Sequence, residues 1–297
     1  MKKKIITRRD FLKDSASFAL AGSLMTQLPV KMLAEEGRKS RVVLIRHQDV
    51  LDKDQKLQEE IVSEMLDQAV TTLTGASDVK KAWKQLINPT DIVGIKSNIW
   101  HYLPTPPALE SAIVSGVRSA GVVEKNIGID DRGILRNPIF KNATALINVR
   151  PLRTHYWSGV GTLLKNYIMF VEKPSDYHDD TCADLAKIWK LPHIEGKTRL
   201  NILVMFTPLF HSIGPHAFNA QYTWAYRGLL VGLDPVAVDA TGLRILLARR
   251  QEYFQEERPL APPAKHIYLA DSRHHLGTAD PAKIDLIKLG WQDGALI

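Results

Sequence analysis

Short apolar runs alternate along this chain with longer segments in which apolar residues recur every three or four positions. Apolar runs of this length predict buried strands, whereas the wider spacing predicts helices. The predicted strands cover residues 41–46, 92–96, 127–129, 143–149, 200–206, 228–233 and 266–269. The predicted helices cover residues 57–73, 79–87, 106–121, 163–171, 176–188 and 235–250. The alternation predicts an α/β fold of three layers, with a mainly parallel sheet covered by helices on both faces.

The first 34 residues have the features of an export signal. Residues 7–13, Thr-Arg-Arg-Asp-Phe-Leu-Lys, resemble the full twin-arginine (Tat) motif. The uncharged stretch of 16 residues that follows, Ser15 to Val30, is short for a membrane span. We therefore expect a signal peptide over residues 1–34, cleaved after Ala34, that engages the Tat translocase and delivers the protein to the periplasm. Residues 35–297 are expected to form a single α/β domain with no integral membrane span.

The charge of the chain is concentrated in this leader. The formal net charge is +7, but residues 1–34 hold seven basic and two acidic residues, which leaves 32 basic and 30 acidic residues in the body. The body therefore has no electrostatic basis for nucleic-acid binding. Cys182 is the only cysteine, so this chain alone can form no disulfide and hold no four-cysteine iron–sulfur cluster. A small buried thiol is the expected role of Cys182, with a catalytic role as the less favoured alternative.

The stretch from Asn148 to Asn166 concentrates the candidate chemistry. It holds four basic side chains and two glycines between a predicted strand and a predicted helix: Arg150, Arg153, His155, Lys165, Gly159 and Gly161. Free N–H groups at a helix start favour an anion, and glycines let the backbone approach it closely. We therefore expect residues 160–163 to wrap an anionic ligand or a carbonyl oxygen. The alternative is a surface loop whose arginines are merely solvated.

Polar side chains also follow the ends of several predicted strands. They are Lys96, Asn98, Asp130, Asp131, Arg153 and His155. If the strands are parallel, these residues converge at one edge of the sheet, which is where open α/β sheets bind ligands.

Asp239 is the most informative carboxylate, because its helical spacing from Val236 and Leu243 places it on an apolar face. A buried carboxylate must be paired, hydrogen-bonded, metal-bound or protonated. Asp239, Asp131 and His178 are the candidate ligands of a metal ion, and backbone N–H groups are the alternative partners of Asp239. His155, His178, His211 and His216 form a second candidate set of metal ligands from separate loops.

Four segments together resemble the domain of unknown function 362 family. They are residues 91–98, 146–155, 164–166 and 234–239, and they follow one another in the family's order and spacing. The resemblance implies the fold and the position of the site rather than a defined reaction. Two departures matter: Arg153 replaces the family's usual lysine and cannot act as a Schiff-base amine, and Val204 and Met205 stand where relatives carry an aspartate.

Together these features predict an exported enzyme for a small anionic or carbonyl-bearing substrate, with a metal or another cofactor as an open question. Lys165, His155 and Lys96 are the expected catalytic residues; Arg153, Asn98, Asn166 and Gly161 are expected to bind the substrate. The alternative is a non-catalytic protein that binds a metal or small ligand and delivers it to a separate exported redox protein.

Overall fold

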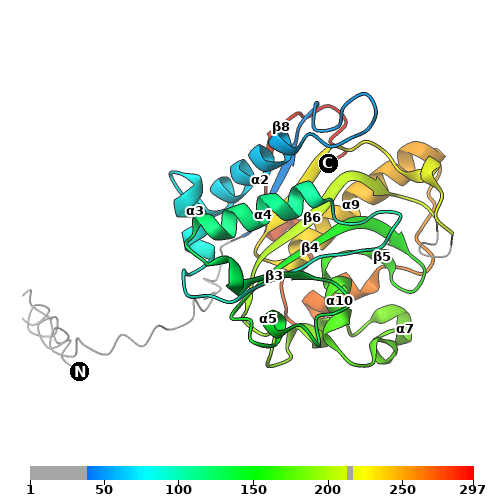
Figure 1. Ribbon diagram of the computed structural model, residues 1–297. Coiled ribbons are helices and arrows are strands. Elements are labelled where there is room, and N and C mark those ends of the chain that lie inside the picture. Colours follow the sequence, from blue (N-terminus) through cyan, green and yellow to red (C-terminus); the bar gives the residue numbers. More distant parts are fainter. Residues whose placement is uncertain (1–38, 213–216) are drawn as a thin grey trace, which may run out of the picture. The chain divides into compact units, whose positions relative to one another are not determined.

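One sheet of eight strands organises the residues that the computed structural model describes, 39–212 and 217–297 (Figure 1). The strand order is β3-β2-β4-β6-β7-β1-β8, and β5 pairs with the end of β4. The strands are β1 (Ser40–Arg46), β2 (Val93–Lys96), β3 (Ile127–Asp130), β4 (Ala145–His155), β5 (Gly159–Gly161), β6 (Thr198–Leu209), β7 (Gly228–Gly232) and β8 (Ile284–Gly290). These residues belong to the unit Gly37–Ile297. The predicted signal peptide and His216 lie outside the described residues.

Neighbouring strands of the sheet are mostly parallel. β3, β2, β4 and β6 form a parallel block, and β1 is parallel to β8. β7 is antiparallel to both of its neighbours, β6 and β1. The parallel block brings the carboxyl ends of β2, β3 and β4 to one edge. This is the arrangement that the convergence of the polar residues after these strands depends on.

Helices cover both faces of this sheet. On one face, α2 (Glu59–Thr74), α3 (Val79–Leu86) and α4 (Pro107–Ser119) bury their apolar sides. On the other face lie α6 (Leu163–Asn166), α8 (Ala186–Trp189), α9 (Pro235–Phe254) and α10 (Lys265–Ser272). Two further short helices are α5 (Pro138–Lys141) and α7 (Asp179–Cys182), and 3₁₀ turns cover Glu124–Asn126, Tyr167–Phe170, Pro174–Tyr177, Ala220–Tyr222 and Pro281–Lys283. The predicted three-layer α/β fold is confirmed.

Local chemistry explains where helix α2 ends and where helix α9 begins. The chain leaves α2 through Gly75, whose φ of 69° is a left-handed conformation that glycine adopts without strain. α9 begins after Asp234, whose carboxylate accepts hydrogen bonds from the N–H groups of Val236 and Ala237. None of the helices in residues 39–212 and 217–297 combines the length and the apolar character that crossing a membrane requires.

Two predicted elements are wrong, and one strand was missed. Residues 266–269 lie in helix α10, because His266, Ile267 and Ala270 face the core at helical spacing, which four residues are too few to reveal. Positive φ angles at Asp180, Thr181 and Cys182 break the predicted helix 176–188 into short pieces. Strand β8 at the sheet edge was not predicted; most of its residues are only half-buried, and polar residues interrupt its apolar run.

Candidate functional site

Strand β4 continues six residues beyond its predicted end at Val149 and forms a hairpin with β5. All eleven positions of β4 are buried, and the Arg150 and Arg153 side chains are each only 4% exposed. The alternative of a solvated basic loop is therefore wrong. Gly161 has a steric role here: a Cβ on this residue would lie 2.9 Å from Nη2 of Arg150.

The start of helix α6 already holds a carboxylate from within the protein. Asp239 on α9 accepts hydrogen bonds from the Thr162 hydroxyl at 2.7 Å, from the Leu163 N–H at 2.9 Å and from the Leu164 N–H at 2.8 Å. Burial raises the pKa of Asp239 to about 7, against the opposing effect of these hydrogen bonds and of Arg150. The expectation that residues 160–163 wrap an external ligand is corrected, because the side chain of Asp239 occupies the N–H groups.

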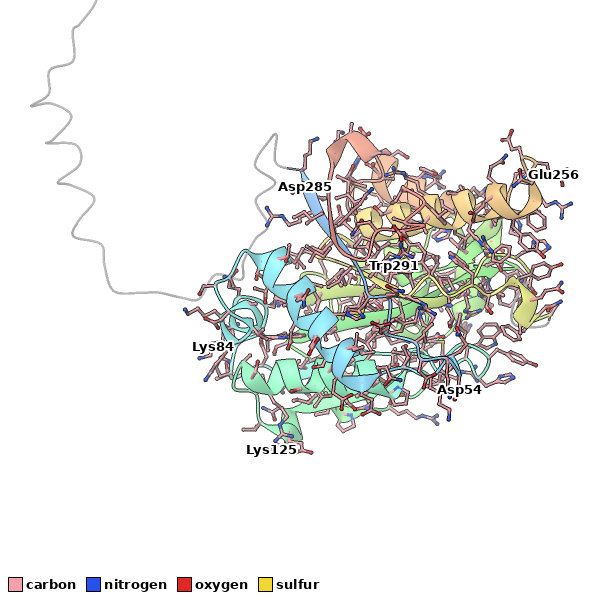
Figure 2. The ribbon with its side chains drawn as sticks, turned by 90° about the horizontal axis from the view of Figure 1, so that it is seen from above. Asp54, Lys84, Lys125, Glu256, Asp285 and Trp291 are labelled. Carbon is pink, nitrogen blue, oxygen red and sulfur yellow. The ribbon has the colours of Figure 1, made fainter. Side chains whose placement is uncertain are left out.

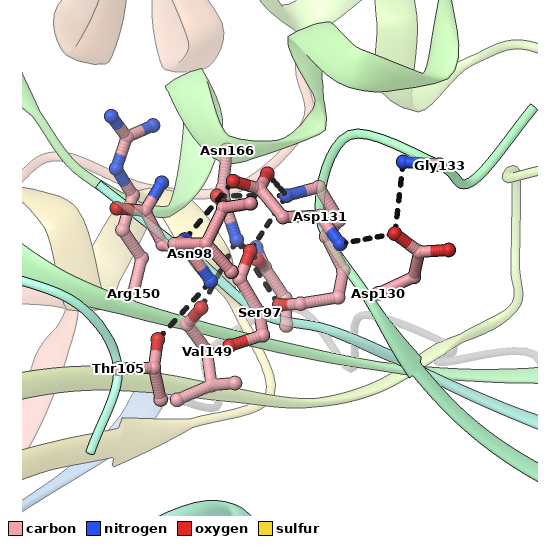
Figure 3. A network of polar contacts seen from close by, with 12 residues as sticks. Ser97, Asn98, Thr105, Asp130, Asp131, Gly133, Val149, Arg150 and Asn166 are labelled. Atoms are coloured by element: carbon pink, nitrogen blue, oxygen red, sulfur yellow. Dashed lines mark hydrogen bonds and ion pairs between the residues drawn. The ribbon is translucent and has the colours of Figure 1, made fainter. Parts of the chain in front are cut away.

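The far end of α6 is locked to the sheet by Asn166 (Figure 3). Its side-chain N–H groups reach Oδ1 of Asn148 at 2.8 Å and the main-chain oxygens of Lys96 and Val149 at 3.1 Å. Its Oδ1 accepts from the Lys96 ammonium at 3.2 Å. These buried contacts fix the helix that carries Lys165.

Lys96 forms a buried ion pair with Asp131 across the ends of β2 and β3. Its Nζ lies 2.5 Å from Oδ1 of Asp131 and 2.7 Å from the carbonyl oxygen of Ser97, so with Asn166 it has three oxygen partners. Burial lowers the pKa of Lys96 to about 8, while Asp131 opposes the shift. Because its three hydrogens are all engaged, Lys96 holds the edge together and is poorly placed to exchange a proton.

Asn98 and the two aspartates shape the same edge (Figure 3). Oδ2 of Asp131 accepts from the N–H of Ile99 at 3.0 Å, and the N–H of Asn98 donates to the Thr105 hydroxyl at 3.2 Å. Asp130 instead stabilises its own turn by accepting from the N–H groups of Asp131 and Gly133. Oδ1 of Asn98 is buried with no hydrogen-bond partner among the described residues.

Lys165 lies on α6 in a second group of side chains. Its Nζ is 3.4 Å from Sγ of Cys182 and 5.8 Å from the centre of the Trp157 ring. In the described part of the chain no carboxylate lies within ion-pair distance of this ammonium. Burial lowers the pKa of Lys165 to about 8, and Arg150 and Arg153 contribute further lowering.

The charge of Lys165 acts on three histidines. Burial and the charge of Lys165 both lower the pKa values of His155, His178 and His266. The pKa falls to about 4 for His178 and to about 3 for His266. All three imidazoles are therefore neutral at pH 7. Nδ1 of His155 accepts from the N–H of Trp157 at 3.2 Å, so the ring proton of His155 resides on Nε2.

Arg153 lies against the face of Trp100, with its Cζ 4.1 Å from the ring centre. Its Nε and Nη1 are buried without a hydrogen-bond partner among residues 39–212 and 217–297, and so is Nε of Arg150. Buried guanidinium donors are normally satisfied, because each orphaned donor costs free energy. The described residues thus leave these guanidinium donors unsatisfied.

The described cluster holds more positive than negative side chains. Lys96, Arg150, Arg153 and Lys165 are its cations, and Asp131 and Asp239 are its carboxylates. Surface charges such as Asp54, Lys84, Lys125 and Glu256 are instead exposed and project outward from the ribbon (Figure 2). Within the cluster, four cations therefore face two carboxylates.

The candidate metal ligands Asp239, Asp131 and His178 do not form a ligand set. Asp239 is occupied by three donors, Asp131 is bound to Lys96, and His178 stacks on Trp157 with ring centres 3.7 Å apart. No group of three or more His, Cys, Asp or Glu side chains in the described ranges is arranged to hold a metal ion. In the second candidate set, Nδ1 of His211 lies 3.1 Å from Arg250. The described residues thus do not fit a metal.

Four residues of the site were missed or undervalued from the sequence: Trp100, Trp157, Cys182 and His266. Trp157 lies two residues after the end of β4, and that proximity was the one available signal. The others come from separate loops or helices, so only long-range packing brings them to the cluster.

The fold and this cluster together define a three-layer α/β protein with a buried, cation-rich site at the carboxyl edge of its parallel strands. The family model described as "Domain of unknown function (DUF362)" matches residues 108–244 of the chain. This match supports the family resemblance, and three of the four segments that carry the resemblance lie inside it, whereas residues 91–98 precede it. The comparisons with curated proteins and with solved structures found no match.

Proposed function

We propose that the buried cluster binds a small anionic substrate, a carboxylate or a phosphate, and that the protein is an enzyme acting on it. The observation that carries the proposal is the set of orphaned guanidinium N–H groups on Arg150 and Arg153. Arginine is suited to carboxylates and phosphates because its planar fork can donate two parallel hydrogen bonds.

The free energy of burial distinguishes a binding residue from a structural one. An ion buried without a partner destabilises the folded protein, since desolvation is not repaid by a counter-charge. Arg153 has no carboxylate within ion-pair distance among the described residues, and two of its three nitrogens are unpaired. A chain that retains such a group gives up stability in exchange for affinity.

The test is the Arg153→Met variant, compared with Arg118→Met at an exposed arginine on α4. We expect Arg153→Met to bind phosphate, sulfate or small carboxylates more weakly by about 1.5–3 kcal/mol, the range for charge-assisted hydrogen bonds. In the absence of anions the same variant is expected to be at least as stable as the unaltered protein. Calorimetry and urea unfolding measure the two effects. Unchanged anion affinity together with a loss of stability would show that Arg153 is structural.

The cellular location of the protein is part of the proposal. Supported by the motif at residues 7–13, we place it in the periplasm after transport by the Tat translocase. Replacing Arg8 and Arg9 together by lysine should leave the folded protein in the cytoplasm. Unchanged export of this double variant refutes the route without affecting the anion site.

One observation favours the alternative of a small-ligand binding protein that serves a separate exported redox protein. Val204 and Met205 lie buried in β6, at the place where the family resemblance implies an aspartate. If that aspartate is catalytic in relatives, this chain binds without turnover. Prolonged incubation of a bound ligand with stoichiometric protein, followed by mass spectrometry, distinguishes the two: a chemical change supports the enzyme, and quantitative recovery supports the binding protein.

A further inference from the structure

Lys165 differs from the other buried lysine in what its ammonium contacts. Lys96 has three oxygen partners, one of them a carboxylate at 2.5 Å. The Lys165 ammonium has one hydrogen-bond partner among the described residues, the Cys182 thiol at 3.4 Å. A thiol is a weak acceptor, so two of the three ammonium hydrogens of Lys165 are left for another group.

The surroundings of Lys165 favour its neutral amine. Every charged group that lowers its pKa is a cation on β4, Arg150 or Arg153, and the imidazoles facing it from β4, from the segment before α7 and from α10 are neutral. The thiol of Cys182 opposes the shift but keeps its proton, because burial raises its pKa. A buried lysine beside other cations is the arrangement that makes an amine nucleophilic near neutral pH.

Groups suited to an oxo acid surround this amine. Arg153 and Arg150 offer unpaired N–H groups for a carboxylate, and Nε2–H of neutral His155 can donate to a carbonyl oxygen. Trp157 and His178 stack beside Lys165 and reduce its contact with water, as its 3% exposure shows. Exclusion of water favours the loss of water on which imine formation depends.

We propose that Lys165 forms an imine with a small 2-oxo acid whose carboxylate is held by Arg153. The amine nitrogen of Lys165 attacks the carbonyl carbon, and the oxygen takes up protons and leaves as water. The product is a protonated imine that retains the positive charge of the original ammonium. No oxidant or reductant takes part. This assignment rests on the proposed anion site and names its substrate class and its reacting residue.

Reductive trapping tests the assignment. The full chain is incubated with pyruvate, glyoxylate or 2-oxoglutarate and cyanoborohydride, and its intact mass and peptides are then measured. We expect one adduct per chain, heavier than the protein by the mass of the acid less one oxygen atom, on Lys165. Lactate provides the same carboxylate without a carbonyl and should give no adduct.

The matched variant is Lys165→Arg, which keeps the positive charge but lacks a nucleophilic amine. In this variant the specific adduct should disappear. Lys173→Arg, at an exposed lysine, should trap the acid as the unaltered protein does. Normal anion binding without an adduct from any of the three acids overturns the imine and leaves the anion site standing. Adducts that persist in Lys165→Arg overturn it equally. Absence of all anion binding refutes the proposed function itself.

Discussion

Replacing Asp239 by asparagine tests whether this buried carboxylate takes up a proton near neutral pH. Oδ1 of Asp239 accepts from Leu163, and Oδ2 accepts from Thr162 and Leu164. An asparagine can place its oxygen at the position with two donors, and its NH₂ group then faces the N–H of Leu163. Each of these two orphaned donors costs about 1–3 kcal/mol.

The pH dependence follows from the raised pKa. Between the ordinary carboxyl pKa of 3.8 and the folded pKa of about 7, the unfolded chain releases its proton and the folded chain does not. The stability contributed by the protonated acid is therefore complete below pH 4 and is lost as the pH rises toward 7. At 1.36 kcal/mol per pKa unit, the loss is about 1.6 kcal/mol at pH 5 and about 4 kcal/mol at pH 8.

We therefore expect Asp239→Asn to be more destabilising at pH 5 than at pH 8, by about 2–3 kcal/mol. Urea unfolding of both proteins at each pH measures this difference, and other titrating groups cancel in the comparison. Asp78→Asn is the control, because Asp78 caps α3 at the surface with a lowered pKa and stays ionised across this range. A difference that does not vary with pH refutes the reasoning, since it means that the three hydrogen bonds keep Asp239 ionised throughout.

Three other outcomes follow from the cluster. Lys96→Met should lower the free energy of unfolding in urea by about 3–5 kcal/mol, because it leaves Asp131 buried without its partner. If the double variant Lys96→Met with Asp131→Asn recovers this stability, that cause is confirmed. Gly161→Ala should lower stability by about 1–3 kcal/mol and weaken sulfate binding, because the new Cβ lies 2.9 Å from Arg150; normal affinity in calorimetry contradicts a role for that arginine. The rate of pyruvate trapping at Lys165 should rise with pH and level off above about pH 8, where the amine is neutral. A rate that continues to rise to pH 10 shows instead that the trapped lysine is an ordinary solvated one.

The sequence located most of the elements and several members of the site. Apolar runs identified β1, β2, β3, β6 and β7, and the helical spacing identified α2, α3, α4 and α9 within a few residues. It also placed Asp239 on a buried face and Lys96 and Asp131 at converging strand ends. These features depend on local periodicity and on the direction of strands, both of which are visible in one dimension.

The partner of each buried charge was invisible in the sequence. The start of α6 was expected to bind an external anion, yet it binds Asp239, which lies more than seventy positions later in the chain. The lysine expected to move protons, Lys96, has every ammonium hydrogen engaged, and Arg153 was found to lie in a buried strand against Trp100. A side chain's type and spacing determine whether it is buried, because burial follows local pattern. Which donor meets which acceptor depends on how distant segments pack, and that packing alone leaves Arg153 unpaired and Lys165 without a carboxylate.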